Sequence, residues 1–208
     1  MKQMAWLGVV LAVLTAGLMI AAPAAQAVVF DLTSDHCSGG CGTPPFGTVT
    51  VVQNGTGVDI DVALAAGYSF VKTGSADFQA FKFNGTGVAL TDITVDAHVP
   101  ALVASAGNFS GDGTGFFGFG INCPSCGNGA SDKFTTPISF TVANASVNDL
   151  IGGNNLGIVF VADVLAPNGN TGPVDVTGTA VPEPGSLLFF SPLLAFAWIL
   201  GVRRWKHR

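Results

Sequence analysis

Apolar and polar residues alternate in short runs through residues 28–181. The runs are rich in β-branched and aromatic residues, and Gly, Asn, Pro and Asp separate them. Alternation with a period of two is typical of strands that bury one face. The only helical candidate is 145–151, which Asn144 would cap. The predicted strands are 46–52, 58–64, 68–72, 78–83, 88–95, 115–121, 137–143, 156–165 and 174–177.

One tetrapeptide occurs twice between predicted strands, as Asn54-Gly55-Thr56-Gly57 and Asn84-Gly85-Thr86-Gly87. Asn-Gly tolerates the positive φ angles of tight hairpins, so we predict a hairpin turn at each copy. Strands at this density need a second layer to bury their apolar faces. The predicted fold class is therefore all-β, an antiparallel β-sandwich, and a jelly-roll connectivity is compatible with the pattern.

Two continuous apolar segments flank this alternating region. The first begins after Lys2, runs from residue 5 to residue 20, and ends in the small residues Ala25-Gln26-Ala27. A basic start, an apolar centre and a small-residue end are typical of a secretory signal peptide. We therefore predict a signal peptide over residues 1–27, with cleavage after Ala27.

The second apolar segment, 187–202, follows Val181-Pro182-Glu183-Pro184. As a helix its 16 residues would reach about 24 Å, short of a bilayer core of about 30 Å unless flanking residues extend it. A basic end stays in the cytoplasm, which would place residues 28–181 outside the inner membrane. The basic residues that would stop transfer are Arg203, Arg204, Lys206 and Arg208.

The order of Pro182-Glu183-Pro184, a short apolar helix and an Arg-rich terminus resembles the PEP-CTERM sorting signal of bacterial secreted proteins. This resemblance covers only the tail, residues 182–208. It implies a precursor anchored in the inner membrane of a Gram-negative bacterium, an exosortase that removes the tail, and a mature protein at the cell surface or in an exopolysaccharide-containing matrix. The alternative is a plain C-terminal anchor whose prolines only stop the helix.

Charge narrows the classes of partner. The chain is 49% hydrophobic and 10% charged, and residues 28–181 carry twelve Asp and three Lys but no Glu or Arg, a net charge of −9. Nucleic-acid binding needs clustered Lys or Arg for phosphate contacts, so we exclude it. The length of 28–181 suits a single extracytoplasmic domain.

Four cysteines form two close pairs, Cys37 with Cys41 and Cys123 with Cys126. Export favours disulfides, and all three connectivities are open. Four thiols could instead hold zinc, and the spacing of the second pair is that of dithiol oxidoreductases. We favour structural disulfides and predict no metal or other cofactor.

Asp-rich composition raises a calcium hypothesis, because carboxylate oxygens are calcium ligands. Asp59 and Asp61 share a strand face and Asp112 lies in a Gly-rich loop, but no complete calcium-loop pattern is present. Asp163 is different, because it shares the face of Val159 and Val161 in an apolar strand. It must either emerge at the strand end or have a buried partner.

Catalytic residues are few. His36 and His98 are the only histidines in residues 28–181, and no nucleophile-elbow or zinc-protease motif occurs. We therefore predict no enzyme activity. The favoured function is that of an exported structural or adhesive protein of the surface or matrix, associated with exopolysaccharide. The alternative is a carbohydrate-binding module, with or without calcium.

Overall fold

The computed structural model describes residues 27–72, 77–176 and 181–182. Strands dominate this part of the chain, and every strand pair in it is antiparallel. The predicted all-β, antiparallel fold class is therefore confirmed. The predicted signal peptide, except Ala27, and the apolar tail lie outside the described residues.

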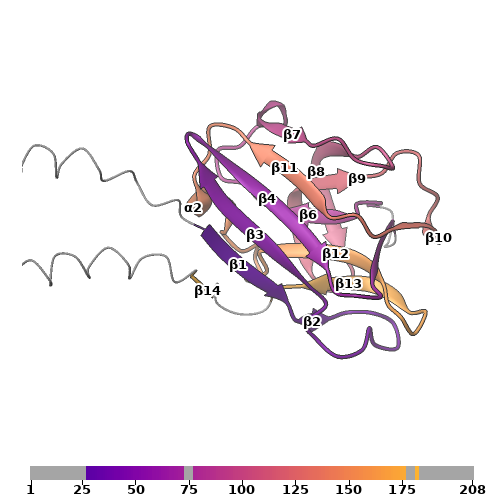
Figure 1. Ribbon diagram of the computed structural model, residues 1–208. Coiled ribbons are helices and arrows are strands. Elements are labelled where there is room, and N and C mark those ends of the chain that lie inside the picture. The colour runs from indigo at the N-terminus through magenta and orange to yellow at the C-terminus, as the bar shows by residue number, and fades with distance from the viewer. Residues whose placement is uncertain (1–26, 73–76, 177–180, 183–208) are drawn as a thin grey trace, which may run out of the picture. The chain divides into compact units, whose positions relative to one another are not determined.

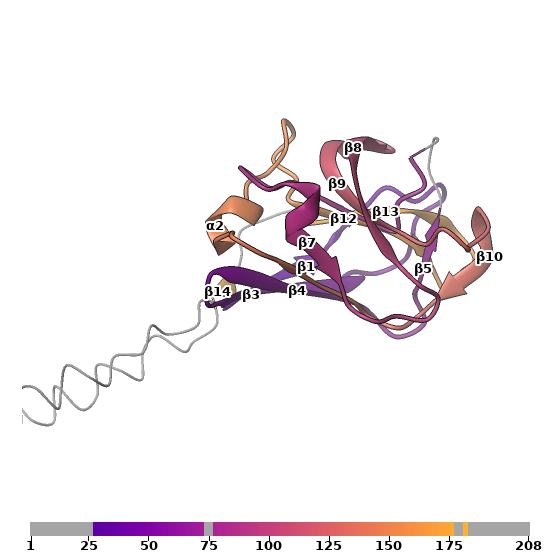
Figure 2. The ribbon, with the colours of Figure 1, turned by 90° about the horizontal axis from the view of Figure 1, so that it is seen from above.

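The strands form two sheets, which Figure 2 shows as two layers seen from above. The order in sheet A is β14 (Val181–Pro182), β1 (Ala27–Leu32), β3 (Gly47–Asn54), β4 (Gly57–Leu64), β11 (Ile138–Val142) and β7 (Ile93–Val95).

In sheet B, β12 lies at the centre. One of its edges pairs with β13, which in turn pairs with β2, and the other edge is shared by β5 and β6. Beyond these, β10 pairs with β5, and β9 lies between β6 and β8. The bounds are β2 (Ser34–Asp35), β5 (Ser69–Lys72), β6 (Phe81–Phe83), β8 (Val103–Gly111), β9 (Gly115–Asn122), β10 (Gly129–Phe134), β12 (Phe160–Leu165) and β13 (Thr171–Asp175).

Phenylalanine rings join the two sheets across the core. Phe140 of sheet A lies between Phe81 and Phe83 of sheet B, with ring centroids 6.1 and 5.1 Å away. Phe30 meets Phe160 edge-on at 5.3 Å. These rings are almost completely buried, so aromatic packing between the sheets supplies much of the apolar area removed from water.

The first Asn-Gly-Thr-Gly tetrapeptide forms the predicted hairpin, in which Asn54 pairs with Gly57 between β3 and β4. For the second copy the prediction is wrong. After β6 in sheet B the chain passes through this copy and the 3₁₀ turn η1 (Leu90–Asp92) to β7 in sheet A. The second tetrapeptide therefore lies in the connection from sheet B to sheet A. Its Thr86 N–H donates a hydrogen bond to the Asp149 carbonyl.

The predicted helix is a single turn, α2 (Val147–Leu150), and its N-cap is Ser146 instead of Asn144. The Asp149 carboxylate accepts hydrogen bonds from both the backbone N–H and the hydroxyl of Ser146. Asn144 has a φ of 53° and belongs to the turn that precedes the helix.

Candidate functional site

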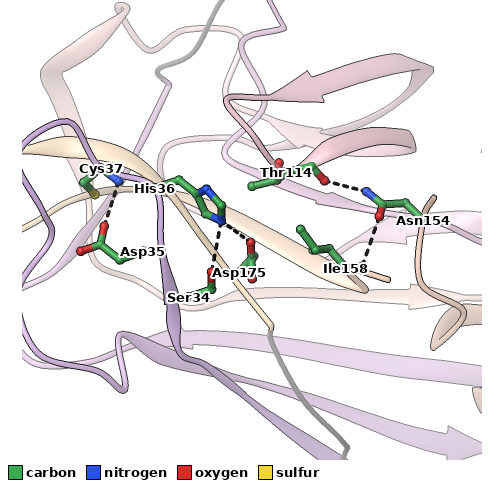
Figure 3. Close-up of polar contacts among 8 residues, drawn as sticks. All are labelled: Ser34, Asp35, His36, Cys37, Thr114, Asn154, Ile158 and Asp175. Carbon is green, nitrogen blue, oxygen red and sulfur yellow. Dashed lines mark hydrogen bonds and ion pairs between the residues drawn. The ribbon is translucent and has the colours of Figure 1, made fainter. Parts of the chain in front are cut away.

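The outer face of sheet B is covered at its centre. The cross-strand register aligns Lys82 of β6, Val161 of β12 and Asp175 of β13 in one row on this face. Phe117, Ile158 and Val161 form a small apolar cluster there, separate from the main core. Asn154 holds the covering segments together, because its amide donates to the Thr114 carbonyl and its carbonyl accepts from Ile158 N–H (Figure 3).

A buried lysine cluster, Lys82 with Asp77 and Asp163, lies on this covered face. Lys82 Nζ is 3.1 Å from Asp163 Oδ2, to which it donates a hydrogen bond, and 3.0 Å from Asp77 Oδ2. The side chains of Lys82, Asp163 and Asp77 are 0%, 1% and 5% exposed. Of the two possibilities that the sequence left open for Asp163, the structure shows the buried partner.

The protonation of this cluster follows from burial and mutual attraction. Burial raises the pKa of Asp163 to about 7, although the positive charge of Lys82 opposes that shift. Burial also disfavours the charged form of Lys82, but Asp163 and Asp77 outweigh it, and the pKa of Lys82 is raised. At neutral pH Lys82 is thus cationic, while Asp163 exchanges between its neutral and ionised forms.

A second polar group, the histidine cluster, consists of Ser34, His36 and Asp175 (Figure 3). His36 Nε2 lies 2.7 Å from Asp175 Oδ2 and 3.1 Å from Ser34 Oγ. In a Ser-His-Asp triad, the hydroxyl and the carboxylate contact opposite ring nitrogens. Here both contact the same nitrogen, so the carboxylate competes with the hydroxyl for it, and the arrangement lacks the geometry that activates a serine.

Burial raises the pKa of the Asp175 carboxyl, and the nearby His36 and Ser34 partly oppose that shift. Asp175 Oδ1 is buried and has no hydrogen-bond partner. His98, the other histidine of the described domain, directs its ring nitrogens at the carbonyls of Pro100 and Thr136. Its ring also meets the Phe134 ring edge-on, so we interpret it as a structural residue.

The cysteines pair locally, Cys37 with Cys41 and Cys123 with Cys126, with Cα separations of 5.4 and 5.3 Å. This is one of the three connectivities that the sequence left open. Asp35 reinforces the first loop, because its two carboxylate oxygens accept the backbone N–H groups of Cys37 and Cys41 at 2.8 and 2.7 Å. Among the described residues, this trio is the one group of metal-type ligands close together, but its sulfurs are bonded to each other.

An open surface hollow of about 300 Å³ lies beside the second disulfide. Its lining is polar, apart from one proline and the disulfide. The lining residues are Pro100, Ser125, Cys126, Asp132 and Lys133.

The calcium candidates Asp59 and Asp61 lie on the outer face of sheet A. Thr141 Oγ1 donates to Asp59 Oδ1 at 2.8 Å, and the Ser139 hydroxyl donates to Asp61. The side-chain amide of Asn54 donates a hydrogen bond to the other carboxylate oxygen of Asp59, Oδ2. These carboxylates therefore have neutral hydrogen-bond donors. Asp112 lies in the turn between β8 and β9, which belong to the other sheet.

The strands that contain two of the predicted processing residues, β1 and β14, are paired at one edge of sheet A (Figure 1). Ala27 begins β1, and Pro182 ends β14, where it pairs with Val28. The compact unit of the described chain ends at Pro182. The remaining predicted tail residues, Glu183, Pro184, Arg203, Arg204, Lys206 and Arg208, lie outside the described residues.

Within residues 27–72, 77–176 and 181–182, no helix has the length and apolar character needed to cross a membrane. No protein-family model matches the chain, and comparisons with curated proteins and with solved structures give no significant match.

Proposed function

We propose that this protein is an exported substrate of an exosortase, and that its processed domain has a structural or adhesive role at the cell surface or in an exopolysaccharide matrix. The proposal includes the signal peptide, the transient tail helix in the inner membrane and the Gram-negative setting that the sorting signal implies. The pairing of β1 with β14 carries the argument.

This pairing supports processing at both ends, because the compact unit begins where the predicted signal peptide ends and finishes where the predicted tail starts. Removal of residues 1–27 leaves Val28 to Leu32 in β1, still paired with β3. The residues from Glu183 onward follow the last strand. Cleavage at either site would therefore leave the two sheets and their core intact.

A structural role suits the chemistry of the domain. The ionisable groups at the centre of sheet B lie in ion pairs with one another, and aromatic side chains mostly pack the core. Two local disulfides close surface loops. Such bridges suit the oxidising compartment outside the cytoplasm that this proposal assigns to the domain. These features suit a domain that stays folded outside the cell.

Intact-mass analysis of the exported protein tests the processing. We expect loss of residues 1–27 and of a tail that begins between Pro182 and Ser186, so that Trp205 is absent. Replacing Glu183 and Pro184 by Ala should leave the tail attached, whereas Pro167→Ala, in an exposed turn, should not. Recovery of the wild-type exported form with Trp205 would refute exosortase processing and leave the plain anchor.

Binding to matrix polysaccharide is tested separately. Pull-down of the processed domain on exopolysaccharide, with and without a chelator, distinguishes an adhesive role from calcium-assisted carbohydrate binding. Retention that the chelator abolishes would support the carbohydrate-binding alternative. Chelator-insensitive retention would support adhesion, and the absence of retention would limit the domain to a structural role.

A further inference from the structure

The buried lysine cluster brings an amine and two carboxyl groups together where water has little access. Lys82 Nζ has Asp163 Oδ2 and Asp77 Oδ2 within 3.1 Å. The end of the β8–β9 hairpin covers this nitrogen closely, since a Cβ placed on Gly111 would lie 3.5 Å from it. We propose that Lys82 and Asp163 condense after folding to form an amide bond between β6 and β12.

The strands hold the reacting groups in place before any reaction. β6 and β12 are antiparallel neighbours, and Asp163 N–H donates to the Ala80 carbonyl next to β6. Reacting atoms held at about 3–3.5 Å gain a large effective concentration over free reactants. Lys82 and Asp163 are 81 residues apart in the sequence, so only the folded domain supplies this proximity.

Asp163 is the better acyl donor of the two carboxyl groups. It lies in a strand, whereas Asp77 lies in the connection before β6. Its Oδ1 is buried without a hydrogen-bond partner, which disfavours the carboxylate ion. Burial raises its pKa to about 7, so the neutral carboxylic acid that condensation requires is populated near neutral pH.

Asp77 completes the reaction as the proton carrier. Its carboxylate takes a proton from the Lys82 ammonium group, and the neutral amine then attacks Cγ of the protonated Asp163 carboxyl. The new C–N bond forms a tetrahedral intermediate, whose hydroxyl leaves as water with the proton returned by Asp77. The Asp77 carboxylate then accepts the second proton that the nitrogen loses, so Asp77 ends as a neutral carboxylic acid beside the neutral amide. The products are one amide and one water, so no oxidant or co-reactant is needed. Exclusion of bulk water favours the condensed state.

Intact-mass spectrometry of the purified, folded protein tests the proposal, with the chain ends assigned by peptide mapping. We expect a mass lower than that of the disulfide-bonded sequence by one water, about 18 Da. A chymotryptic digest should contain a branched peptide joining Lys82 to Asp163. A mass equal to that of the disulfide-bonded sequence, with no loss of water, would overturn the proposal. So would a water loss that maps to a succinimide at Asp112-Gly113.

Variants separate the reaction from the ion pair. Lys82→Arg keeps the positive charge but cannot form the amide, so it should keep the full mass, while the matched variant Lys72→Arg should still lose water. Asp77→Asn should slow or abolish the loss. Each variant is compared in its folded fraction after size-exclusion chromatography. Water loss in Lys82→Arg would overturn the assignment.

Discussion

The outer faces of the two sheets use aspartate in opposite ways. On sheet A, Asp61 is exposed and lies in a cross-strand row between Thr50 and Ser139, so its polar partners are neutral. On sheet B, Asp163 is buried and its partner is the cation of Lys82. An exposed carboxylate keeps its hydration and needs no counter-charge, whereas a buried one must be paired or neutralised.

All four cysteines add to this contrast. Cys37 and Cys41 follow β2, and Cys123 and Cys126 lie between β9 and β10, so both bridges are attached to sheet B. The outer face of sheet A is a regular polar surface. The outer face of sheet B is instead covered by loops, which hydrogen bonds, disulfides and buried ion pairs fix in place. The difference predicts where substitutions will matter.

The largest effect should come from removing the buried cation. Lys82→Met leaves Asp77 and Asp163 without their counter-charge and also prevents the proposed amide. It should therefore cost at least about 3–5 kcal/mol of unfolding free energy, the loss that follows from removing one member of a buried pair. Lys133→Met, at an exposed lysine, should cost less than about 1 kcal/mol. Urea unfolding of the two variants measures the difference. Equal midpoints would mean that the buried cluster contributes nothing.

Reducing the disulfides should have a smaller effect. Each bridge closes a short loop, with sequence separations of four and three, so the chain-entropy model gives about 2 kcal/mol per bridge. Unfolding with and without a reductant measures this loss. A thiol assay on the unreduced, denatured protein should find no free thiol, and two or more per chain would contradict the pairing.

A pH dependence should arise from the histidine cluster. Folding raises the pKa of Asp175, so the stability that its protonated form contributes is complete below the ordinary carboxyl pKa of about 4. That stability is lost as pH rises through the higher folded-state value. Thermal midpoints from about pH 4 to about pH 8 should therefore fall less steeply in Asp175→Asn than in the wild type. Parallel curves would show that Asp175 does not titrate with folding.

The smallest effect should be on the outer face of sheet A. Asp61→Asn keeps an oxygen that can accept from Ser139 and removes an exposed charge, so the change should stay below about 0.5 kcal/mol. Millimolar calcium should not shift the thermal midpoint of either protein. A calcium-dependent shift that Asp61→Asn abolishes would revive the calcium hypothesis at this face.

Local patterns were sufficient to predict the strands that alternate strongly. The β3–β4 hairpin follows from Asn-Gly between two Val-rich runs. The strand β8 was missed because its residues, mainly Ala, Ser, Gly and Asn, have low β propensity, and pairing with β9 decides its conformation. Of the predicted strand 88–95, only the last three residues form a strand, β7, because η1 occupies the centre of that segment.

The buried polar groups were only partly predictable. The pattern around Asp163 left two possibilities, emergence at the strand end or a buried partner. The pairing with Lys82 depends on β6 and β12 being neighbours. His36 and Asp175 are 139 residues apart, and no local signal connects them. Pairing of distant strands therefore sets the chemistry of sheet B, which one sequence does not encode as a motif.

The pairing of β1 with β14 brings the first and last strands of the domain next to each other. Because Val28 pairs with Pro182, a short linker could join the two ends without crossing the core. New ends could then be opened at the exposed β3–β4 turn, which contains Gly55 and Thr56. A circular permutant of this kind should keep the same sheets, with β1 and β14 joined at their common edge and the new chain ends at the β3–β4 turn.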